Sequence, residues 1–500
     1  GRIVFRGDQV RDENGFYAVF SEQGTSASHM AGTKIINAIA RMPGNCGEDS
    51  DAVAAYTQIP LSDAVRLLGM DVMPETWISL PYERRPKDGS WDKFTDPVCP
   101  LTQNLYGHPL AGLLWDKGSQ ERIIKAGFEK IKGWESLYVH REKQMFLSVY
   151  VDDFHMAGPK ENMAPMWKAL ADNGLKLDPP VPFNGHQYLG CQQVEVENPI
   201  ALIKTKTEMI ETIQQLRTPK TEAPDAGGCT ETSGTSVIDE EEPTTPKSKP
   251  KRTTPPTTPQ KSKKKAKQEA TALAASSSFD SEYKSKYAHI TSYEDRMNGA
   301  AEGCIERYLE LSKCKLESLK RVATPCIDDN LMSPEDFISK GALAPFASKI
   351  VLKALYLARL ARPDLLYSVN ALAREVTKWT AACDKRLHRL MSYIHHTRDN
   401  VMLSFVGDRA CDCKLMLFCD ASFAGDLTDS KSTSGSIICL VGPNTFAPLT
   451  WMCKKQGAVS HSSTEAEVIS MDAAVRLDGL PLLMLWDLVI ETLHPETCSK

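Results

Sequence analysis

Two adjacent aspartates lie at the tip of an otherwise apolar hairpin, and this pattern constrains the fold more than any other in the chain. Met145–Val149 alternates and is rich in β-branched and aromatic residues, which predicts a buried strand. Asp152 and Asp153 then predict a tight turn, and Phe154–Met156 predicts a returning strand. Adjacent carboxylates repel each other unless a divalent cation lies between them. The tip is therefore a candidate Mg²⁺ site, although Asp-Asp is also common in solvated turns.

A third acid occupies an unusual place. Asp51 begins an apolar segment that extends to Gln58 and follows a turn-like stretch rich in Gly, Asn, Glu and Asp. A carboxylate at the start of an apolar element is uncommon unless the group has a ligand. Paired Mg²⁺ ions with oxygen ligands are the usual catalysts of phosphoryl and nucleotidyl transfer. The three acids together therefore indicate that class of chemistry.

A second set of acids occurs near the C-terminal end. Lys414–Asp420 predicts a strand that ends on an acid, and Ser436–Val441 predicts the next strand. Ser462 and the acids that follow it form a helix N-cap signature, and Ala466–Leu477 has helical spacing. Glu467 lies in the first turn of that helix. Carboxylates on adjacent elements suit a second metal site, whereas Glu467 alone would be read as a solvated helix residue.

Composition bounds the remaining possibilities. The chain has 500 residues, enough for about three domains, and a formal net charge of −5, so nucleic-acid binding would require local basic faces. No apolar run is long enough for a membrane span, and no signal peptide is recognisable. The 14 cysteines show no CxxC pair with a histidine partner, which argues against a zinc ribbon and suits a reducing compartment.

The middle of the chain has a different composition. Residues 218–285 are rich in Thr, Pro, Ser and Lys with few large apolar residues, which predicts a disordered linker. Its basic clusters Lys247–Arg252 and Lys261–Lys265 suit nuclear import, RNA-backbone contacts or simply a soluble tether. After the linker, Ile350–Lys378 has helical periodicity, and Pro363 predicts a break into two helices.

These motifs carry a family resemblance. Tyr150–Asp153 resembles the YxDD box of reverse transcriptases, and Asp51–Gln58 resembles the first-aspartate motif of these enzymes in Copia-type retrotransposons. Leu105–Trp115 resembles their LYG…W box, and Tyr188–Gly190 resembles their FLG strand. The resemblance implies that Asp51, Asp152 and Asp153 form the metal-binding carboxylates of a palm domain.

The same resemblance implies two substrate-binding residues. Tyr56 corresponds to the aromatic steric gate that rejects a 2′-OH, the alternative being a plain core aromatic. Gly1–Gly7 resembles a fingers strand in which Arg2 faces the triphosphate, the alternative being an ordinary exposed arginine. The sequence departs from the family pattern at Pro109, Leu110 and Gly112, where the family usually carries Lys-Gln and then Pro. The glutamine that would line the nucleotide pocket is therefore absent.

The C-terminal boxes resemble the RNase H domain of Copia-type elements. The resemblance makes Asp420 and Glu467 metal ligands and gives Glu465 a role at the helix N-terminus. The family needs a third and usually a fourth aspartate further along, and the sequence stops at Lys500. We therefore expect weak RNA cleavage or none.

The resemblance implies an α+β and α/β multidomain fold: a right-hand polymerase with palm and fingers, a helical thumb or connection, and an RNase H-like α/β domain. The expected boundaries are 1–217 for the fingers, palm and start of the thumb, 218–285 for the linker, 286–410 for the thumb or connection, and 411–500 for the RNase H-like domain. Because the sequence begins with glycine, we expect a piece of a longer Pol polyprotein.

The implied function is RNA-directed DNA synthesis with two Mg²⁺ ions per active site, Mn²⁺ being the alternative ion. The implied partners are an RNA template, a DNA primer, dNTPs and other parts of a Pol polyprotein, without a membrane, in the cytoplasm, the nucleus or both. The oligomeric state is left open. Two alternatives remain: a decayed transposon copy that binds nucleic acid without catalysis, and an unrelated metal-dependent nuclease or phosphotransferase.

Overall fold

The computed structural model describes residues 4–6, 30–72, 75–217, 286–426 and 429–497. The chain divides into two units, one formed by Gly1–Pro199 with His289–Lys500 and the other by Ile200–Ala288. In the second unit the structure describes the helix α5 (Ile200–Arg217) and residues 286–288. The predicted linker 218–285 lies outside the described residues.

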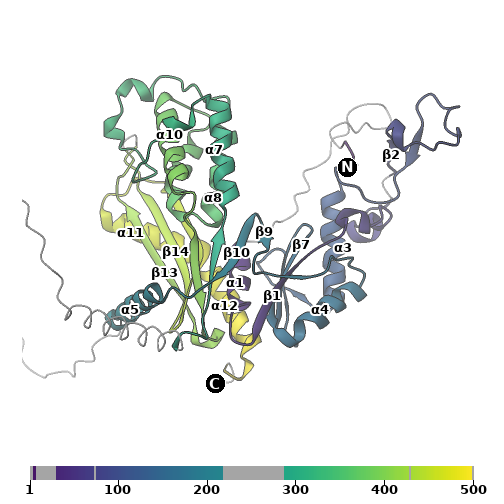
Figure 1. Cartoon of the computed structure of the whole chain (residues 1–500), viewed down its shortest axis with the longest axis horizontal. Coiled ribbons are helices and arrows are strands. Elements are labelled where there is room, and N and C mark those ends of the chain that lie inside the picture. The colour runs from purple at the N-terminus through teal and green to yellow at the C-terminus, as the bar shows by residue number, and fades with distance from the viewer. Residues whose placement is uncertain (1–3, 7–29, 73–74, 218–285, 427–428, 498–500) are drawn as a thin grey trace, which may run out of the picture. The chain divides into compact units, whose positions relative to one another are not determined.

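A six-stranded antiparallel sheet occupies the first part of the larger unit (Figure 1). Its strands, in spatial order, are β4 (Glu129–Lys130), β5 (Leu137–His140), β6 (Met145–Tyr150), β7 (Asp153–Pro159), β1 (Asn45–Asp51) and β8 (Val181–Pro182). One face packs with α3 (Ala111–Lys125) and α4 (Lys160–Asp172) in a core that includes Leu147, Phe154 and Met156. The other face packs against α1 (Met30–Ile39) around Phe146 and Ala157. The short helix α2 (Asp63–Leu68) contacts α3.

The predicted hairpin is confirmed with one change. β6 and β7 pair from Phe146 with Ala157 to Tyr150 with Asp153, so the apolar run is a buried strand as expected. The turn consists of Val151 and Asp152, and Val151 has a positive φ of 58°. Asp153 is therefore the first residue of the returning strand and does not lie in the turn.

The structure corrects the expectation for the stretch before Asp51. The Gly-, Asn-, Glu- and Asp-rich residues form strand β1, with β7 on one side and β8 on the other, and Asp51 is the last residue of that strand. This polar sequence is accommodated because its side chains have partners. Ser50 Oγ donates to Asp178 O at 2.7 Å, and Glu48 Oε2 accepts from the Trp167 indole at 2.8 Å.

A seven-stranded sheet joins sequence segments from both sides of residues 218–285. Its spatial order is β13 (Lys414–Ser422), β14 (Thr433–Gly442), β15 (Thr445–Lys455), β12 (Met402–Val406), β11 (Thr291–Arg296), β10 (Cys191–Val196) and β9 (Gln187–Tyr188). The pairing of β10 with β11 and of β11 with β12 is antiparallel and regular. This sheet therefore extends across the expected boundaries at 217 and 410. A separate pair, β2 (Trp77–Ser79) with β3 (Val98–Pro100), completes the described strands.

Helices of the second half pack into their own apolar core. They are α7 (Asn298–Ser312), α8 (Ala347–Leu360), α9 (Leu366–Arg374) and α10 (Ala381–His396). The helix α11 (Ser463–Ala474) packs on β13 and β14, whereas α12 (Leu480–Leu493) packs into the core that also contains α1 and β14. The predicted break at Pro363 is confirmed, because a short 3₁₀ turn at Pro363–Leu365 separates α8 from α9. No helix in the described ranges has the length and apolar character needed to cross a bilayer.

Helix α1 connects the two sheets. It contacts β1, β6 and β7 of the first sheet and β15 of the second. Lys34 of α1 makes a buried ion pair with Asp295 of β11 at 2.7 Å. Breaking one partner of such a buried pair is strongly destabilising, so α1 fixes the position of the first sheet against the second.

Gly47 generates a stability prediction. A Cβ at this position would lie 2.2 Å from the Phe183 ring and 2.7 Å from Ala40 Cβ, whereas a Cβ at Gly299 of α7 would meet no atom within 4 Å. We predict that Gly47→Ala lowers the free energy of unfolding by roughly 1–3 kcal/mol because the site is overpacked. Urea unfolding measures this, with Gly299→Ala as the control. Equal stability of the two variants would contradict the packing described here.

Candidate functional site

The register of β1 against β7 brings three sequence-distant acids together. Asp51 and Asp153 are direct partners in the antiparallel pairing. Directly opposite residues in such a pair have Cα atoms roughly 4.5–5.5 Å apart and project their side chains to one face. The carbonyl oxygen of Asp152 accepts a hydrogen bond from Ala52 N at 2.7 Å. The hairpin tip is therefore fastened to the end of the strand that carries Asp51.

Burial and the neighbouring negative charges shift the pKa values of Asp51 and Asp153. Burial, together with the negative charges of Asp152, Asp51 and Asp49, raises the pKa of Asp153 to about 6, while His186 opposes the rise. Burial also raises the pKa of Asp51; His186 lowers it, and Asp152, Asp178 and Asp49 add to the rise. A divalent cation would relieve this repulsion, and carboxylate oxygens are the ligands that Mg²⁺ prefers.

The acids at this site have donor atoms that suit a metal ion, but their side chains are not arranged around one. The acids supply the oxygen ligands that a hard cation requires. Across the described part of the chain, however, no group of three His, Cys, Asp or Glu side chains is already arranged to hold a metal ion. These carboxylates fit Mg²⁺ by type, and side-chain rotation would be required to bring them onto a shared ion.

The LYG…W box lies against the hairpin. The indole of Trp115 on α3 donates a hydrogen bond to the carbonyl oxygen of Val151, the turn residue with positive φ. The segment that precedes α3 also contacts the beginning of the chain, since Phe5 N donates to Tyr106 O at 2.7 Å. Gly107 has a φ of 89°, and a Cβ there would lie 2.0 Å from Phe5 O, so this close approach requires glycine.

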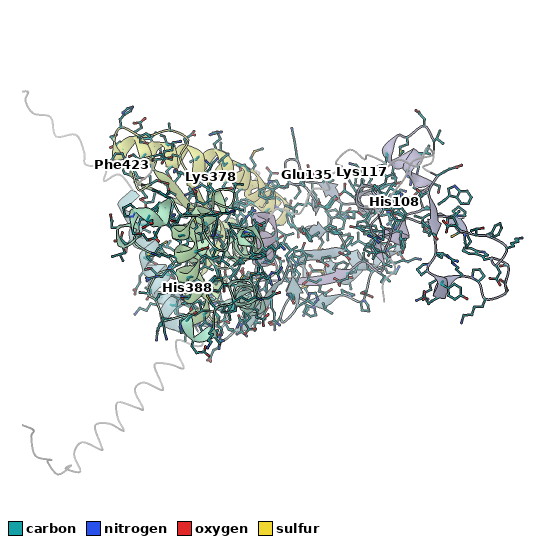
Figure 2. The ribbon with its side chains drawn as sticks, turned by 90° about the horizontal axis from the view of Figure 1, so that it is seen from above. His108, Lys117, Glu135, Lys378, His388 and Phe423 are labelled. Carbon is teal, nitrogen blue, oxygen red and sulfur yellow. The ribbon has the colours of Figure 1, made fainter. Side chains whose placement is uncertain are left out.

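The ring of His108, in the same box, lies 5.3 Å from the Phe5 ring, centroid to centroid. Figure 2 labels His108 and Lys117 on this part of the molecule. Arg2, predicted to face the triphosphate, lies outside the described residues.

Tyr56 lies close to the acids and borders a cavity. It belongs to a 3₁₀ turn at Ala55–Gln58, and its ring packs on Tyr106 with centroids 4.4 Å apart. Burial raises the pKa of Tyr56, and the negative charge of Asp152 adds to the rise, so the two side chains are near each other. Tyr56, Gly112, Trp115 and Tyr150 contribute to the lining of a cavity of about 130 Å³. Tyr56, the candidate steric gate, and the hairpin thus line the same cavity.

A buried polar network was not identified from the sequence. Both carboxylate oxygens of Asp49 bind histidines: Oδ1 lies 2.5 Å from His155 Nδ1 and Oδ2 lies 2.9 Å from His186 Nδ1. The other ring nitrogen of His155 lies 2.7 Å from Asn37 Oδ1 on α1. The His155 ring stacks on Phe183 at 3.8 Å with an interplanar angle of 7°. This network links α1, β1, β7 and the segment around His186, and therefore stabilises the register that opposes Asp51 to Asp153.

A local signal for this network existed in the sequence. Asp49 is two residues before Asp51 and His155 is two residues after Asp153, which places each pair on one face of its strand. Polar residues on the inner face of an otherwise apolar hairpin indicate a buried hydrogen-bonded partner. The partner His186, however, is distant in sequence and carried no such signal.

The second pair of acids, Asp420 and Glu467, lies on a strand and a helix that pack against each other. Asp420 lies in β13 opposite Gly435 of β14, and Ser470 Oγ of α11 donates to the Asp420 carbonyl oxygen at 2.7 Å. Glu467 is one helical turn before Ser470, and both acids are exposed.

The start of α11 is fixed by buried and capping hydrogen bonds. The amide of Gln456 donates to Ser434 Oγ at 3.0 Å and to Ala466 O at 2.9 Å. At the helix N-terminus, Ser462 Oγ accepts from Glu465 N at 3.1 Å, and Glu465 Oε2 accepts from His461 N at 2.7 Å. Glu465 therefore contributes to the cap, while Glu467 lies one turn from the contact with β13.

The raised pKa of Asp153 predicts a pH-dependent cost to stability. Between the ordinary aspartate pKa and about 6, the folded chain binds more protons at this site than the unfolded chain, so stability falls as pH rises through that window. We predict that Asp153→Asn stabilises the metal-free protein at neutral pH and that the gain shrinks towards pH 4. Urea unfolding across this pH range measures the difference. Asp172→Asn, at an exposed position of α4, is the control. A gain for Asp153→Asn that did not depend on pH would contradict the electrostatic origin.

Comparisons with known proteins agree with the motifs. No family model matches the sequence. Over 189 residues the chain is 33% identical to the retrovirus-related Pol polyprotein from transposon RE2 of Arabidopsis thaliana, covering 37% of this chain and 12% of that protein. Over 165 residues it is 28% identical to a putative transposon Ty5-1 protein of Saccharomyces cerevisiae, covering 33% of this chain and 51% of that protein. Over 122 residues it is 33% identical to secreted RxLR effector protein 161 of Plasmopara viticola, covering 24% of this chain and 81% of that protein.

The matched regions span at most about half the length of the two transposon relatives. The similarity confirms the resemblance to Copia-type retrotransposon Pol polyproteins. Over the matched regions the chain is similar to the Pol polyproteins of Copia-type retrotransposons.

Proposed function

We propose that the chain is an RNA-directed DNA polymerase that adds a deoxynucleotide to a primer 3′-OH on an RNA template. The observation that supports this most is the direct pairing of Asp51 with Asp153, beside Asp152 at the hairpin tip. Polymerase chemistry requires carboxylates from separate segments at one place, because the transferring phosphoryl group is stabilised mainly by positioning and charge.

Asp51, Asp152 and Asp153 would hold two Mg²⁺ ions, or Mn²⁺ in their place. When bound, these ions supply Lewis-acid stabilisation of the charge that develops on the α-phosphate. The protein's own part is to hold the acids in register through β1 and β7 and to fasten the turn through Trp115.

Tyr56 would restrict the sugar that enters the neighbouring cavity, since an aromatic ring there leaves no volume for a 2′-OH. The RNA template would be bound through its backbone and sugar hydroxyls rather than its sequence. Other parts of a Pol polyprotein are further proposed partners. The described cysteines are free thiols, which supports a reducing location in the cytoplasm, the nucleus or both.

The C-terminal part would be an RNase H-like domain in which Asp420 and Glu467 contribute to a second metal site. Its support is the contact of α11 with β13 through Ser470, which brings the two acid-bearing elements together.

A second candidate function is nucleic-acid binding without catalysis. Two observations favour it: the nucleotide-pocket glutamine is replaced in the LYG box, and the described acids are not prearranged for a metal. Cleavage without synthesis would instead indicate a metal-dependent nuclease that uses the same carboxylates.

Primer extension on an RNA template distinguishes these functions. We predict Mg²⁺-dependent extension by the wild-type chain and a loss of at least about 100-fold for Asp152→Asn, since a ligand charge is removed at unchanged size. Asp172→Asn is the matched control and should extend normally. Salt-sensitive binding with no extension would support the second candidate. Extension that survives Asp152→Asn would contradict the site assignment.

A further inference from the structure

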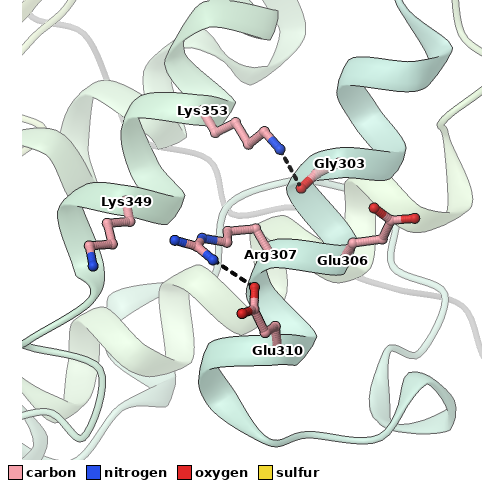
Figure 3. Close-up of a pocket in the computed structure, with 6 residues that line it drawn as sticks. All are labelled: Gly303, Glu306, Arg307, Glu310, Lys349 and Lys353. Atoms are coloured by element: carbon pink, nitrogen blue, oxygen red, sulfur yellow. Dashed lines mark hydrogen bonds and ion pairs between the residues drawn. The ribbon is translucent and has the colours of Figure 1, made fainter. Parts of the chain in front are cut away.

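Two cavities away from the carboxylate site differ in size and in the state of their polar groups. An open groove of about 770 Å³ lies between α7 and α8 (Figure 3). Polar groups in this groove pair with each other, since Arg307 binds Glu310 at 2.6 Å and Lys353 Nζ donates to Gly303 O at 3.1 Å. A much smaller cavity of about 20 Å³ lies between α1, β10 and β11, and its lining holds buried polar groups that are not paired in this way.

The small cavity lies where α1 meets one face of the seven-stranded sheet. Lys34 and Asn37 of α1 line it, and residues three apart lie on the same face of a helix. Gln193 of β10 and Asp295 of β11 line it from the other side. These two residues are direct partners in the antiparallel pairing, so their side chains project to one face of the sheet. Gln193 is 6% exposed and Asp295 is 3% exposed, so bulk solvent cannot satisfy their polar atoms.

Two acceptors in this cavity lack donors. Asp295 Oδ2 accepts from Lys34 Nζ at 2.7 Å, whereas Asp295 Oδ1 has no donor within the described part of the chain. Gln193 Oε1 likewise has none among the residues that the structure describes. Buried polar atoms are nearly always hydrogen-bonded, because an unpaired acceptor has lost its hydration without compensation. The two oxygens therefore indicate a small bound donor between them.

The charge and the volume of the cavity limit what this donor can be. Burial lowers the pKa of Lys34, but Asp295 and other neighbours together raise it above its ordinary value, so the cavity already holds an ammonium that repels a metal cation. Burial, and then the negative charge of Asp295, raise the pKa of the Cys191 thiol, which is therefore neutral and only a weak donor. A volume of about 20 Å³ exceeds the roughly 10–15 Å³ that one water requires and excludes a larger ligand.

We propose that one ordered water binds in this cavity, donates hydrogen bonds to Asp295 Oδ1 and Gln193 Oε1, and accepts one from Lys34. The two hydrogens of a water match the two acceptors, and three polar partners are typical of a buried water. The water connects β10 and β11 to α1, the helix that contacts both sheets. Asn37, which also lines the cavity, lies 2.7 Å from His155 Nε2, so the water stabilises the part of α1 that holds this histidine.

A crystal structure of the full chain, at a resolution that shows ordered solvent, tests this inference directly. We predict one water peak within about 2.5–3.0 Å of both Asp295 Oδ1 and Gln193 Oε1. An empty cavity would contradict the proposal. So would a Gln193 amide turned to donate directly to Asp295, because no acceptor would then be left for a water to bridge.

The stability of one variant supplies a second test, and its sign is informative. Gln193→Met keeps the length of the side chain and removes the acceptor. We predict that its urea unfolding midpoint falls, because the bound water loses a partner. A rise in the midpoint would show that Oε1 had been an unsatisfied acceptor, which would contradict the proposal. Gln103→Met, at an exposed position, is the matched control and should leave the midpoint unchanged.

Both tests are independent of the proposed polymerase activity, because neither requires a substrate or a metal ion. If Gln193→Met does not fold, the density of the wild-type chain decides. A chain that binds the water and extends no primer would keep this inference and lose the polymerase proposal, whereas an empty cavity in an active polymerase would do the reverse.

Discussion

The antiparallel pairing of β1 with β7 is the constraint on which the rest of the site depends. It determines that Asp51 faces Asp153 and that the hairpin tip hydrogen-bonds to the residue after Asp51. A shift of one residue would turn every side chain of β1 to the other face of the sheet. The site therefore exists only if this register is specified, and a strand with the sequence of β1 has few apolar residues to specify it.

The hydrogen-bond network around Asp49 specifies the register of β1 against β7. Its carboxylate binds His155 of β7 and His186 between β8 and β9, and His155 also binds Asn37 of α1. Buried hydrogen-bonded groups tolerate few alternative arrangements, because an unpaired buried polar group costs about 1–3 kcal/mol. Polar side chains thus determine the register here, where a typical sheet would rely on an apolar pattern. The same strand then ends in an acid whose pKa is raised by burial and by its neighbours. The hydrogen bonds of Asp49 therefore stabilise the sheet only two residues before Asp51, where the neighbouring carboxylates repel each other.

The sequence predicted the elements whose signals are local. The apolar run Met145–Val149 identified the hairpin, and Pro363 marked a helix break, because periodicity and a missing N–H act within a few residues. Strand β1 was missed, since its polar residues have partners on α4, on β7 and in the segments before and after β8, none of them near in sequence. The seven-stranded sheet was missed for the same reason: β10 and β11 pair across residues 218–285, and no local pattern records that pairing. Motif resemblance named Asp51, Asp152 and Asp153, but it could not supply Asp49, His155 and His186, which no quoted motif includes.

The most direct test of the central idea, that Asp51 and Asp153 share a divalent cation, is a metal-binding measurement that requires no turnover. Mn²⁺ binding can be followed by electron paramagnetic resonance of the free ion. We predict saturable Mn²⁺ binding by the wild-type chain and at least about tenfold weaker binding for both Asp51→Asn and Asp153→Asn, because each substitution removes one ligand charge. Unchanged Mn²⁺ affinity in both variants would show that the two acids, although paired across the sheet, do not form a metal site.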